Sequence, residues 1–264
     1  MLMQDKVVII SGIGPGLGVE LALLAAREGA KAVVLAARTA SKLSDAAQQI
    51  ASLGLGTQTL EVATDISRPE DCKHLVTKTV EAFGRIDAVV NSAYIPGKFG
   101  SWEKWDFDDW RKTMDVNLFG SLNLSREAAR VMKDQPERGA IVMVNSMVTK
   151  NVISAQGGYA TSKGALATAT RALASELAPL GIRVNSCFMG WMWGANVKGF
   201  VEGMAAKNGV DPSVVKKGFE KNIPLGEMPT DKDCAKGCLF LVSDYAKVIT
   251  GASLDINGGE YMPH

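Results

Sequence analysis

Short apolar runs alternate with longer amphipathic stretches along almost the whole chain, and this alternation constrains the fold more than any other feature. The apolar runs have strand length: Val7–Ser11, Ala32–Ala36, Thr59–Ala63, Ala88–Asn91, Ala140–Asn145, Arg183–Phe188 and Ser253–Ile256. The stretches between them have helical patterns: Leu17–Glu28, Ser41–Leu53, Pro69–Phe83, Asp108–Lys133, Tyr159–Leu180 and Asp231–Ser243. Strands and helices in such alternation form parallel sheets with right-handed crossovers and helices on both faces. The pattern predicts an α/β fold, a doubly wound Rossmann-type parallel sheet of seven strands flanked by helices.

The same pattern indicates a single domain. The 264 residues fit one α/β unit, and the chain has no internal repeat and no low-complexity linker. Only Trp191–Lys221 departs from the rhythm, because it is rich in Gly, Lys, Met and Trp and has no clear strand. We interpret residues 191–221 as an insertion over the functional site. The glycines from Gly194 onward favour a mobile lid.

The composition limits the possible partners. Hydrophobic residues make up 47% and charged residues 22% of the chain, and the net charge of +1 gives no basis for a nucleic-acid or membrane-surface partner. No apolar run reaches the ~18 residues that cross a bilayer, and no signal peptide is recognisable, so we expect a cytoplasmic protein. The four cysteines form no C-x-x-C pair, and only two histidines are present. We therefore expect reduced thiols and no metal site.

A glycine-rich segment joins the first predicted strand to the first predicted helix. Glycine lets the backbone turn sharply and approach a pyrophosphate, and a helix N-terminus offers N–H groups and partial positive charge to phosphates. Glycine clusters also occur in purely structural turns, but the order strand, turn, helix favours a nucleotide site. The candidate contacts are Gly12, Gly14, Pro15, Gly16, Leu17 and Gly18.

Tyr159 and Lys163 lie four residues apart at the start of a predicted helix and so share one face. An ammonium beside a phenol favours the phenolate and lowers the pKa of the tyrosine, which can then exchange a proton with a carbonyl or alcohol oxygen near neutral pH. An ordinary amphipathic helix start would show the same spacing.

Two further polar residues strengthen the catalytic interpretation. Ser146 follows a predicted strand, at the carboxyl edge where open α/β sheets bind ligands, and its hydroxyl can hydrogen-bond a substrate oxygen. Asn117 lies within a long predicted helix, where asparagine is unfavourable unless its amide has a partner. A buried amide that caps a neighbouring carbonyl is the alternative for Asn117.

Taken together, these features resemble the short-chain dehydrogenase/reductase family. The resemblance spans essentially the whole chain and includes the glycine turn, Asn91-Ser92-Ala93, Asn117, Ser146, Tyr159-x-x-x-Lys163 and the closing Asn257-Gly258-Gly259. It implies that Tyr159 is the general acid/base and that Ser146 positions the substrate oxygen. Lys163 would lower the tyrosine pKa and hold the nicotinamide ribose, and Asn117 would hold a proton-relay water. The other cofactor contacts implied are Asp65, Ile66, Asn91, Ala93, Gly190 and Met192.

The sequence departs from the family pattern at two places. Tyr94 stands where the family has glycine after Asn91-Ser92-Ala93; it either packs under the following loop or reaches the site. After the sixth predicted strand the usual Pro-Gly is Met189-Gly190, and Gly194 stands where a threonine contacts the nicotinamide carboxamide. Another group must then recognise the carboxamide.

The second predicted strand ends in Arg38, with no carboxylate to bond the ribose of NAD. A guanidinium can bind a 2′-phosphate, which favours NADP. NAD stays possible, because the glycine turn carries no second basic residue and Arg38 can also stack on adenine.

Bulky side chains gather near the predicted strand ends. Tyr94, Trp191 and Trp193, with Trp102, Met192 and Met204 nearby, predict a large apolar substrate pocket, although the tryptophans would also suit local packing of the insertion.

We therefore predict an oxidoreductase that transfers a hydride between NADP(H) or NAD(H) and a bulky ketone or secondary alcohol. The family resemblance and the apolar faces of two helices also predict a homotetramer. A catalytically silent nucleotide-binding member of the same fold, or a lyase or epimerase, is the alternative.

Overall fold

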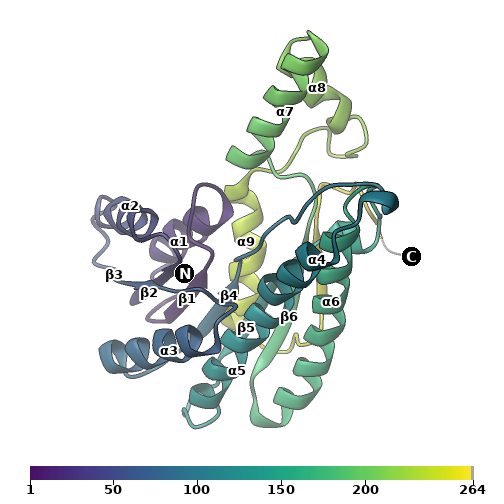
Figure 1. The fold of residues 1–264 in the computed structure, drawn as a ribbon. Coiled ribbons are helices and arrows are strands. Elements are labelled where there is room, and N and C mark those ends of the chain that lie inside the picture. Colours follow the sequence, from purple (N-terminus) through teal and green to yellow (C-terminus); the bar gives the residue numbers. More distant parts are fainter. Residues whose placement is uncertain (263–264) are drawn as a thin grey trace.

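The computed structural model describes residues 1–262, and their central feature is one seven-stranded parallel sheet (Figure 1). Its strands are β1 (Val7–Ser11), β2 (Ala32–Ala37), β3 (Gln58–Ala63), β4 (Ala88–Asn91), β5 (Ala140–Ser146), β6 (Arg183–Met189) and β7 (Ser253–Ile256). The strand order is β3-β2-β1-β4-β5-β6-β7. The order reverses between β1 and β4, where Ser11 pairs with Asn91. Ligands of open α/β sheets bind beyond the carboxyl ends of the strands at such a reversal. The predicted fold class is confirmed.

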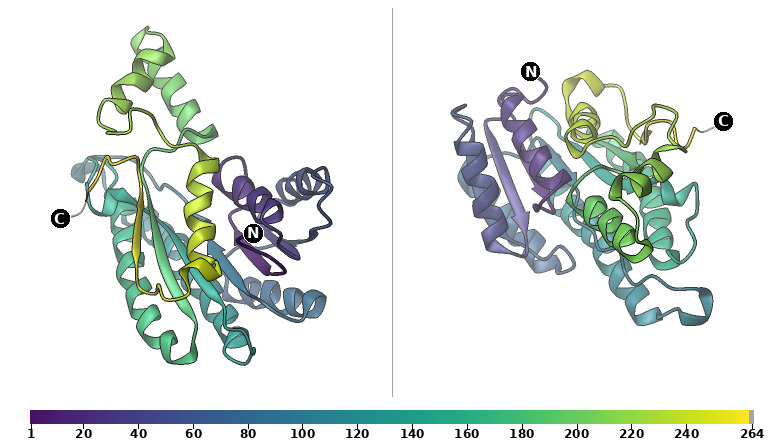
Figure 2. Two further views of the ribbon diagram at one scale, coloured as in Figure 1. Left: turned by 180° about the vertical axis from the view of Figure 1, so that it is seen from behind. Right: turned by 90° about the horizontal axis from the view of Figure 1, so that it is seen from above.

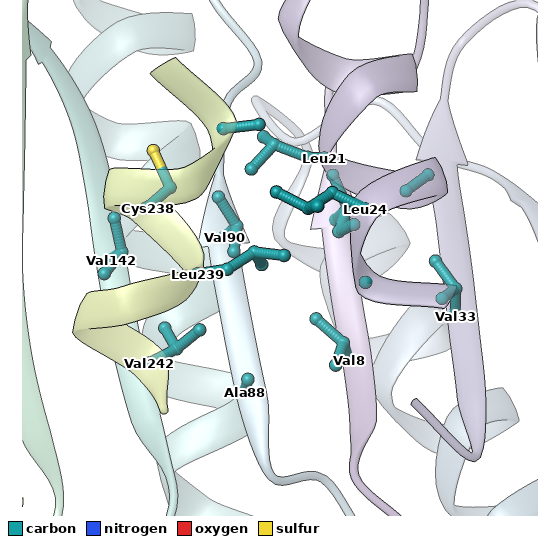
Figure 3. Close-up of a cluster of buried hydrophobic side chains, with 14 of the residues drawn as sticks. Val8, Leu21, Leu24, Val33, Ala88, Val90, Val142, Cys238, Leu239 and Val242 are labelled. Carbon is teal, nitrogen blue, oxygen red and sulfur yellow. The ribbon is translucent and has the colours of Figure 1, made fainter. Parts of the chain in front are cut away.

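Helices cover both faces of the sheet, as expected for strands that are almost wholly apolar. The helices are α1 (Leu17–Arg27), α2 (Ala40–Ala51), α3 (Pro69–Phe83), α4 (Phe107–Met114), α5 (Ser121–Met132), α6 (Gly157–Leu177), α7 (Ala195–Asn208), α8 (Pro212–Glu220) and α9 (Asp231–Val242). Helices α1, α2 and α9 cover one face (Figure 2), and α3, α5 and α6 cover the other. Leu21 and Leu24 of α1 pack with Leu239 of α9 over Val8 and Val90 (Figure 3).

Two segments differ from the sequence-based expectation. The helix expected over Asp108–Lys133 is divided by a π-helical turn at Asp115–Gly120, which contains the buried Asn117. Residues 191–221 contain α7 and α8, which project beyond the carboxyl ends of the strands (Figure 1). No helix of the described part of the chain is long and apolar enough to cross a membrane.

Candidate active site

Two adjoining cavities open at the carboxyl ends of the central strands. The first, of about 310 Å³, lies between the glycine turn, the end of β2 and the start of α7. The second, of about 220 Å³, lies over the end of β5 and the first turn of α6. Leu17, Ser92, Tyr94, Met192 and Val197 line both cavities, so the two spaces adjoin. A long ligand in the first cavity can therefore reach a small one in the second.

The glycine turn forms one wall of the first cavity, and its glycines are required by close backbone approach. A Cβ atom on Gly12 would lie 2.5 Å from the Ala93 nitrogen, and one on Gly18 would overlap the Gly12 carbonyl oxygen. Gly16, the residue before α1, has a φ of 110° and provides no side-chain cap for the first N–H groups of that helix. A tight turn before an uncapped helix N-terminus fits the phosphates of a dinucleotide.

The far end of the first cavity carries two cations. Arg38 follows β2 as predicted, and Lys42 comes from the first turn of α2, with its Nζ 3.9 Å from the Cβ position of Gly14. Asp65 and Ile66 line this end as expected, and the Asp65 carboxylate accepts hydrogen bonds from Ser67. Sequence reasoning missed Lys42 because the contact depends on how α2 packs against the turn.

Asn91, by contrast, lines neither cavity, although it was expected among the cofactor contacts. It is buried at the end of β4, where its amide nitrogen donates a hydrogen bond to Ser125 Oγ at 3.0 Å. Ser92 and Ala93 form the cavity wall in its place.

Tyr159 and Ser146 meet in the second cavity, each brought there by its own element. Ser146 ends β5, Tyr159 lies in the first turn of α6, and both side chains line the second cavity. Burial raises the pKa of Tyr159 far above its usual value, the nearby Tyr94 phenol raises it further, and the Ser146 hydrogen bond opposes both. The phenol is therefore protonated at neutral pH.

Lys163 lies close to the Tyr159 ring, but the pKa of this tyrosine is raised and not lowered, contrary to our expectation. Its Nζ lies 6.0 Å from the Tyr159 ring centroid and donates a hydrogen bond to the Val144 carbonyl at 2.7 Å. The residue is 3% exposed, and burial lowers the pKa of its amine to about 7. Desolvation therefore removes part of the ammonium charge that would stabilise a phenolate at neutral pH.

The side chain of Asn117 joins two segments through hydrogen bonds. Its Oδ1 accepts a hydrogen bond from the Ile95 nitrogen at 2.8 Å, and its Nδ2 donates to the Ile95 carbonyl at 2.9 Å and to Ser162 Oγ at 3.0 Å. The amide thus ties the loop after β4 to α6, which matches the structural alternative. Both amide protons are engaged, so the side chain has no donor left for a relay water.

Comparisons with known proteins agree with this geometry. A family model described as enoyl-(acyl carrier protein) reductase matches residues 12–260. The chain is 34% identical over 261 residues to an uncharacterized oxidoreductase of Thermotoga maritima, covering 98% of each chain. It is 32% identical to L-rhamnose 1-dehydrogenase (NAD(P)(+)) of Azotobacter vinelandii, covering 99% of each. The chain belongs to the short-chain dehydrogenase/reductase family. It is an NAD(P)-dependent oxidoreductase that acts on alcohol or carbonyl groups, which favours an enzyme over a catalytically silent member.

Solved structures of short-chain dehydrogenases/reductases superpose on it along almost the whole chain. Levodione reductase has a TM-score of 0.91 at 29% identity, covering 98% of both chains. L-Sorbose reductase from Gluconobacter frateurii, complexed with NADPH and L-sorbose, has a TM-score of 0.93 at 25% identity, covering 100% of this chain and 99% of the other.

The residues that depart from the short-chain dehydrogenase/reductase pattern have different places in the site. Tyr94 lies between the cavities, with its ring 6.0 Å from that of Tyr159 and 5.8 Å from Lys163 Nζ, and its hydroxyl accepts a hydrogen bond from Asn196 at 3.4 Å. Trp191 lines the second cavity and packs against Phe219 of α8.

Trp193 lines neither cavity, so its prediction as a pocket residue is wrong. The centroid of its ring lies 4.9 Å from Lys216 Nζ and 5.6 Å from Lys198 Nζ, so the ring packs against side chains of the insertion itself. Trp102 is 72% exposed, and Met204 lines neither cavity. The alternative of local packing therefore holds for Trp193: its backbone nitrogen donates a hydrogen bond to the Pro229 carbonyl, and its ring lies against the lysines of the insertion.

Proposed function

We propose that this enzyme reduces a bulky, apolar ketone with NADPH, with Tyr159 as the general acid. The observation that carries the proposal is the presence of Tyr159 and Ser146 together in an apolar cavity that adjoins the glycine-turn cavity. The glycine turn, Arg38 and Lys42 would hold the dinucleotide, whose nicotinamide supplies the hydride. Met192 lines both cavities and Gly190 lines the second, so the nicotinamide would lie beside these two residues.

The proton chemistry follows from the pKa values of the site. Tyr159 is protonated at neutral pH because burial raises its pKa, and a protonated phenol can donate to the carbonyl oxygen as it gains charge. The hydroxyl of Ser146, which lines the same cavity, can donate a second hydrogen bond to that oxygen. The Lys163 amine, with its pKa near 7, can hold or release a proton at neutral pH. The reverse reaction, alcohol oxidation, would use the same groups.

The lining of the second cavity supports a bulky, apolar substrate. Gln156 adds a polar amide to its wall. The aliphatic, aromatic and sulfur-containing side chains of the wall include Phe99, Met147, Val148, Ile153, Trp191 and Val197. Apolar walls with few polar groups suit an alicyclic or long-chain carbonyl compound. Methionine and tryptophan contribute large contact areas there.

Preference for NADP is supported by the pair Arg38 and Lys42 at the adenosine end of the first cavity. Related structures contain NAD⁺, NADPH or NADH, so membership of the family does not decide the choice. Two cations and no carboxylate at the end of β2 favour the 2′-phosphate.

We also propose that the enzyme is a cytoplasmic homotetramer.

The test is NADPH consumption with a series of ketones that rises in size from acetone to bicyclic and long-chain compounds. We expect kcat/KM to increase with apolar bulk. Tyr159→Phe should lower kcat by roughly 10²–10⁴-fold and leave the Kd of NADPH unchanged. Equal efficiency with acetone would contradict the substrate class, and wild-type turnover in Tyr159→Phe would contradict the mechanism.

A further inference from the structure

One carboxylate stands in the cavity wall where the phosphates of a dinucleotide would bind. Asp231, the first residue of α9, lines the first cavity together with the glycine turn. Its Oδ2 lies 3.3 Å from the Cβ position of Gly16, the residue before α1. A Cβ on Gly194, the residue before α7, would overlap the same oxygen. The two glycines thus make room for this carboxylate between the N-termini of α1 and α7.

Asp231 has no evident structural task in this position. Thr230 already caps α9 by accepting a hydrogen bond from the Asp233 nitrogen. Within residues 1–262, neither oxygen of the Asp231 carboxylate accepts a hydrogen bond. A half-buried carboxylate without donors is costly, so its retention at the cavity points to a role toward the ligand.

The charged groups around Asp231 belong to two helices. Glu20 of α1 is a second anion, and Lys198 of α7 is the opposing cation. Burial raises the pKa of the Asp231 carboxyl, Glu20 raises it further, and Lys198 lowers it. Arg38 and Lys42 line the same cavity at its far end, beside the position of the adenosine.

We infer that Asp231 links dinucleotide binding to a proton, so that the enzyme binds the pyrophosphate more tightly when this carboxyl is protonated. The inference rests on the cofactor site of the proposed function. The N-termini of α1 and α7 favour one anion between them, and Asp231 already provides a negative charge there. A bound pyrophosphate adds a second negative charge at close range and further raises the pKa of the carboxyl. Binding then takes up a proton, and the affinity falls as the pH rises.

The experiment measures the Kd of NADH by its fluorescence between pH 5 and 8.5 for the wild type and Asp231→Asn. NADH is the probe because the 2′-phosphate of NADPH itself titrates near pH 6. We expect Asp231→Asn to bind NADH about tenfold more tightly than the wild type at pH 8. The ratio of the two Kd values should approach one as the pH falls and the wild-type carboxyl is protonated.

Asp233→Asn is the matched control, because it removes the same charge from the same helical turn outside the cavity. Its Kd should follow that of the wild type at every pH. ADP-ribose, which has the pyrophosphate but no nicotinamide, should show the same gain with Asp231→Asn.

Two results would overturn the inference. A pH-independent ratio near one would show that the carboxylate does not affect the pyrophosphate. A loss of NADH affinity in Asp231→Asn, with ADP-ribose unchanged, would make Asp231 an acceptor for the nicotinamide carboxamide. Failure of every variant to bind either ligand would overturn the proposed function as well, so the two failures are distinguishable.

Discussion

The amine of Lys163 is almost wholly buried, donates a hydrogen bond to the Val144 carbonyl and lies near the Tyr159 phenol. Among the described residues it has no carboxylate partner. Its pKa falls from 10.5 to about 7 because burial penalises the charged form. Between pH 7 and pH 10.5 the Lys163 amine is therefore protonated in the unfolded chain and neutral in the folded chain. The free energy of unfolding therefore increases with pH from about 7 to about 10, and below pH 7 the protein bears the full desolvation cost.

This linkage predicts the behaviour of Lys163→Met. The free energy of unfolding of the wild type, relative to this variant, should rise by about 1.4 kcal/mol per pH unit between pH 7 and 9.5. The variant loses the hydrogen bond to Val144, but it also avoids the cost of burying an ammonium group. Its stability relative to the wild type is therefore greatest at low pH. Urea denaturation across this range measures the difference, with Lys247→Met, an exposed position, as the control. Parallel curves for the wild type and Lys163→Met would contradict the prediction.

The two cations of the first cavity give a second prediction for single residues. Arg38→Ala and Lys42→Ala should each weaken NADPH binding about tenfold, because each removes one charge-assisted contact at an exposed site, and should change NADH binding much less. The Kd values of both cofactors, with Lys73→Ala on α3 as the control, measure the effect. If the wild type already binds NADH more tightly, or if both variants weaken the two cofactors equally, the NADP assignment is wrong.

Single residues also show what the sequence can and cannot predict. Tyr159, Ser146 and Lys163 could be placed together because the carboxyl end of a strand and the start of the next helix meet at one edge of a parallel sheet. Lys42 and Asp231 gave no such signal, since each reaches the first cavity only through the packing of its helix against the glycine turn. The pKa of Tyr159 was also beyond the sequence, because burial outweighs spacing.

At the scale of elements, the strands were predictable almost to the residue, because a strand of a parallel sheet is a continuous apolar run between polar turns. The sequence did not predict the π turn at Asp115–Gly120, since the apolar spacing of a helix continues through it. Helices α7 and α8 were also missed, because their glycines lower helix propensity and obscure the pattern.

Those glycines give a prediction about α7 and α8. A Cβ on Gly199, Gly203 or Gly218 would meet no atom within 4 Å, so packing does not require glycine there, and each weakens its helix by about 0.5–1 kcal/mol relative to alanine. We expect amide hydrogen exchange in α7 and α8 to be fast in the free enzyme. It should slow when NADPH and a ketone bind, because Ala195 and Val197 line the cavities.

The triple variant Gly199→Ala, Gly203→Ala, Gly218→Ala should already exchange slowly in this segment without ligand. Gly209 stays unchanged, because its φ of 64° suits glycine. Helix α3, none of whose residues lines either cavity, serves as the internal reference. Identical exchange in the free and bound enzyme would show that α7 and α8 form a fixed wall and not a lid.

At the scale of the whole molecule, the outer face of α6 and the π turn beside it remain uncovered. Phe119 is 52% exposed, Thr161, Thr168 and Ala172 are exposed, and a Cβ on Gly164 would meet no atom within 4 Å. Small residues on a helix let a second helix approach closely, and an exposed phenylalanine gains from being covered. With the family resemblance, this face supports the predicted homotetramer.

The last prediction tests this assembly with a substitution that the single chain tolerates. Light scattering of the wild type at micromolar concentration should give four times the mass of the chain. Gly164→Leu adds a side chain into open space in the monomer, so it should leave the fold intact, as far-ultraviolet circular dichroism can verify, while it blocks close packing of α6 against a second copy. We expect this variant to dissociate to smaller species. Gly199→Leu, which also meets open space but lies on α7, should keep the wild-type mass. A monomeric wild type would rule out the tetramer, and an unchanged mass for Gly164→Leu would exclude the outer face of α6 from the interface.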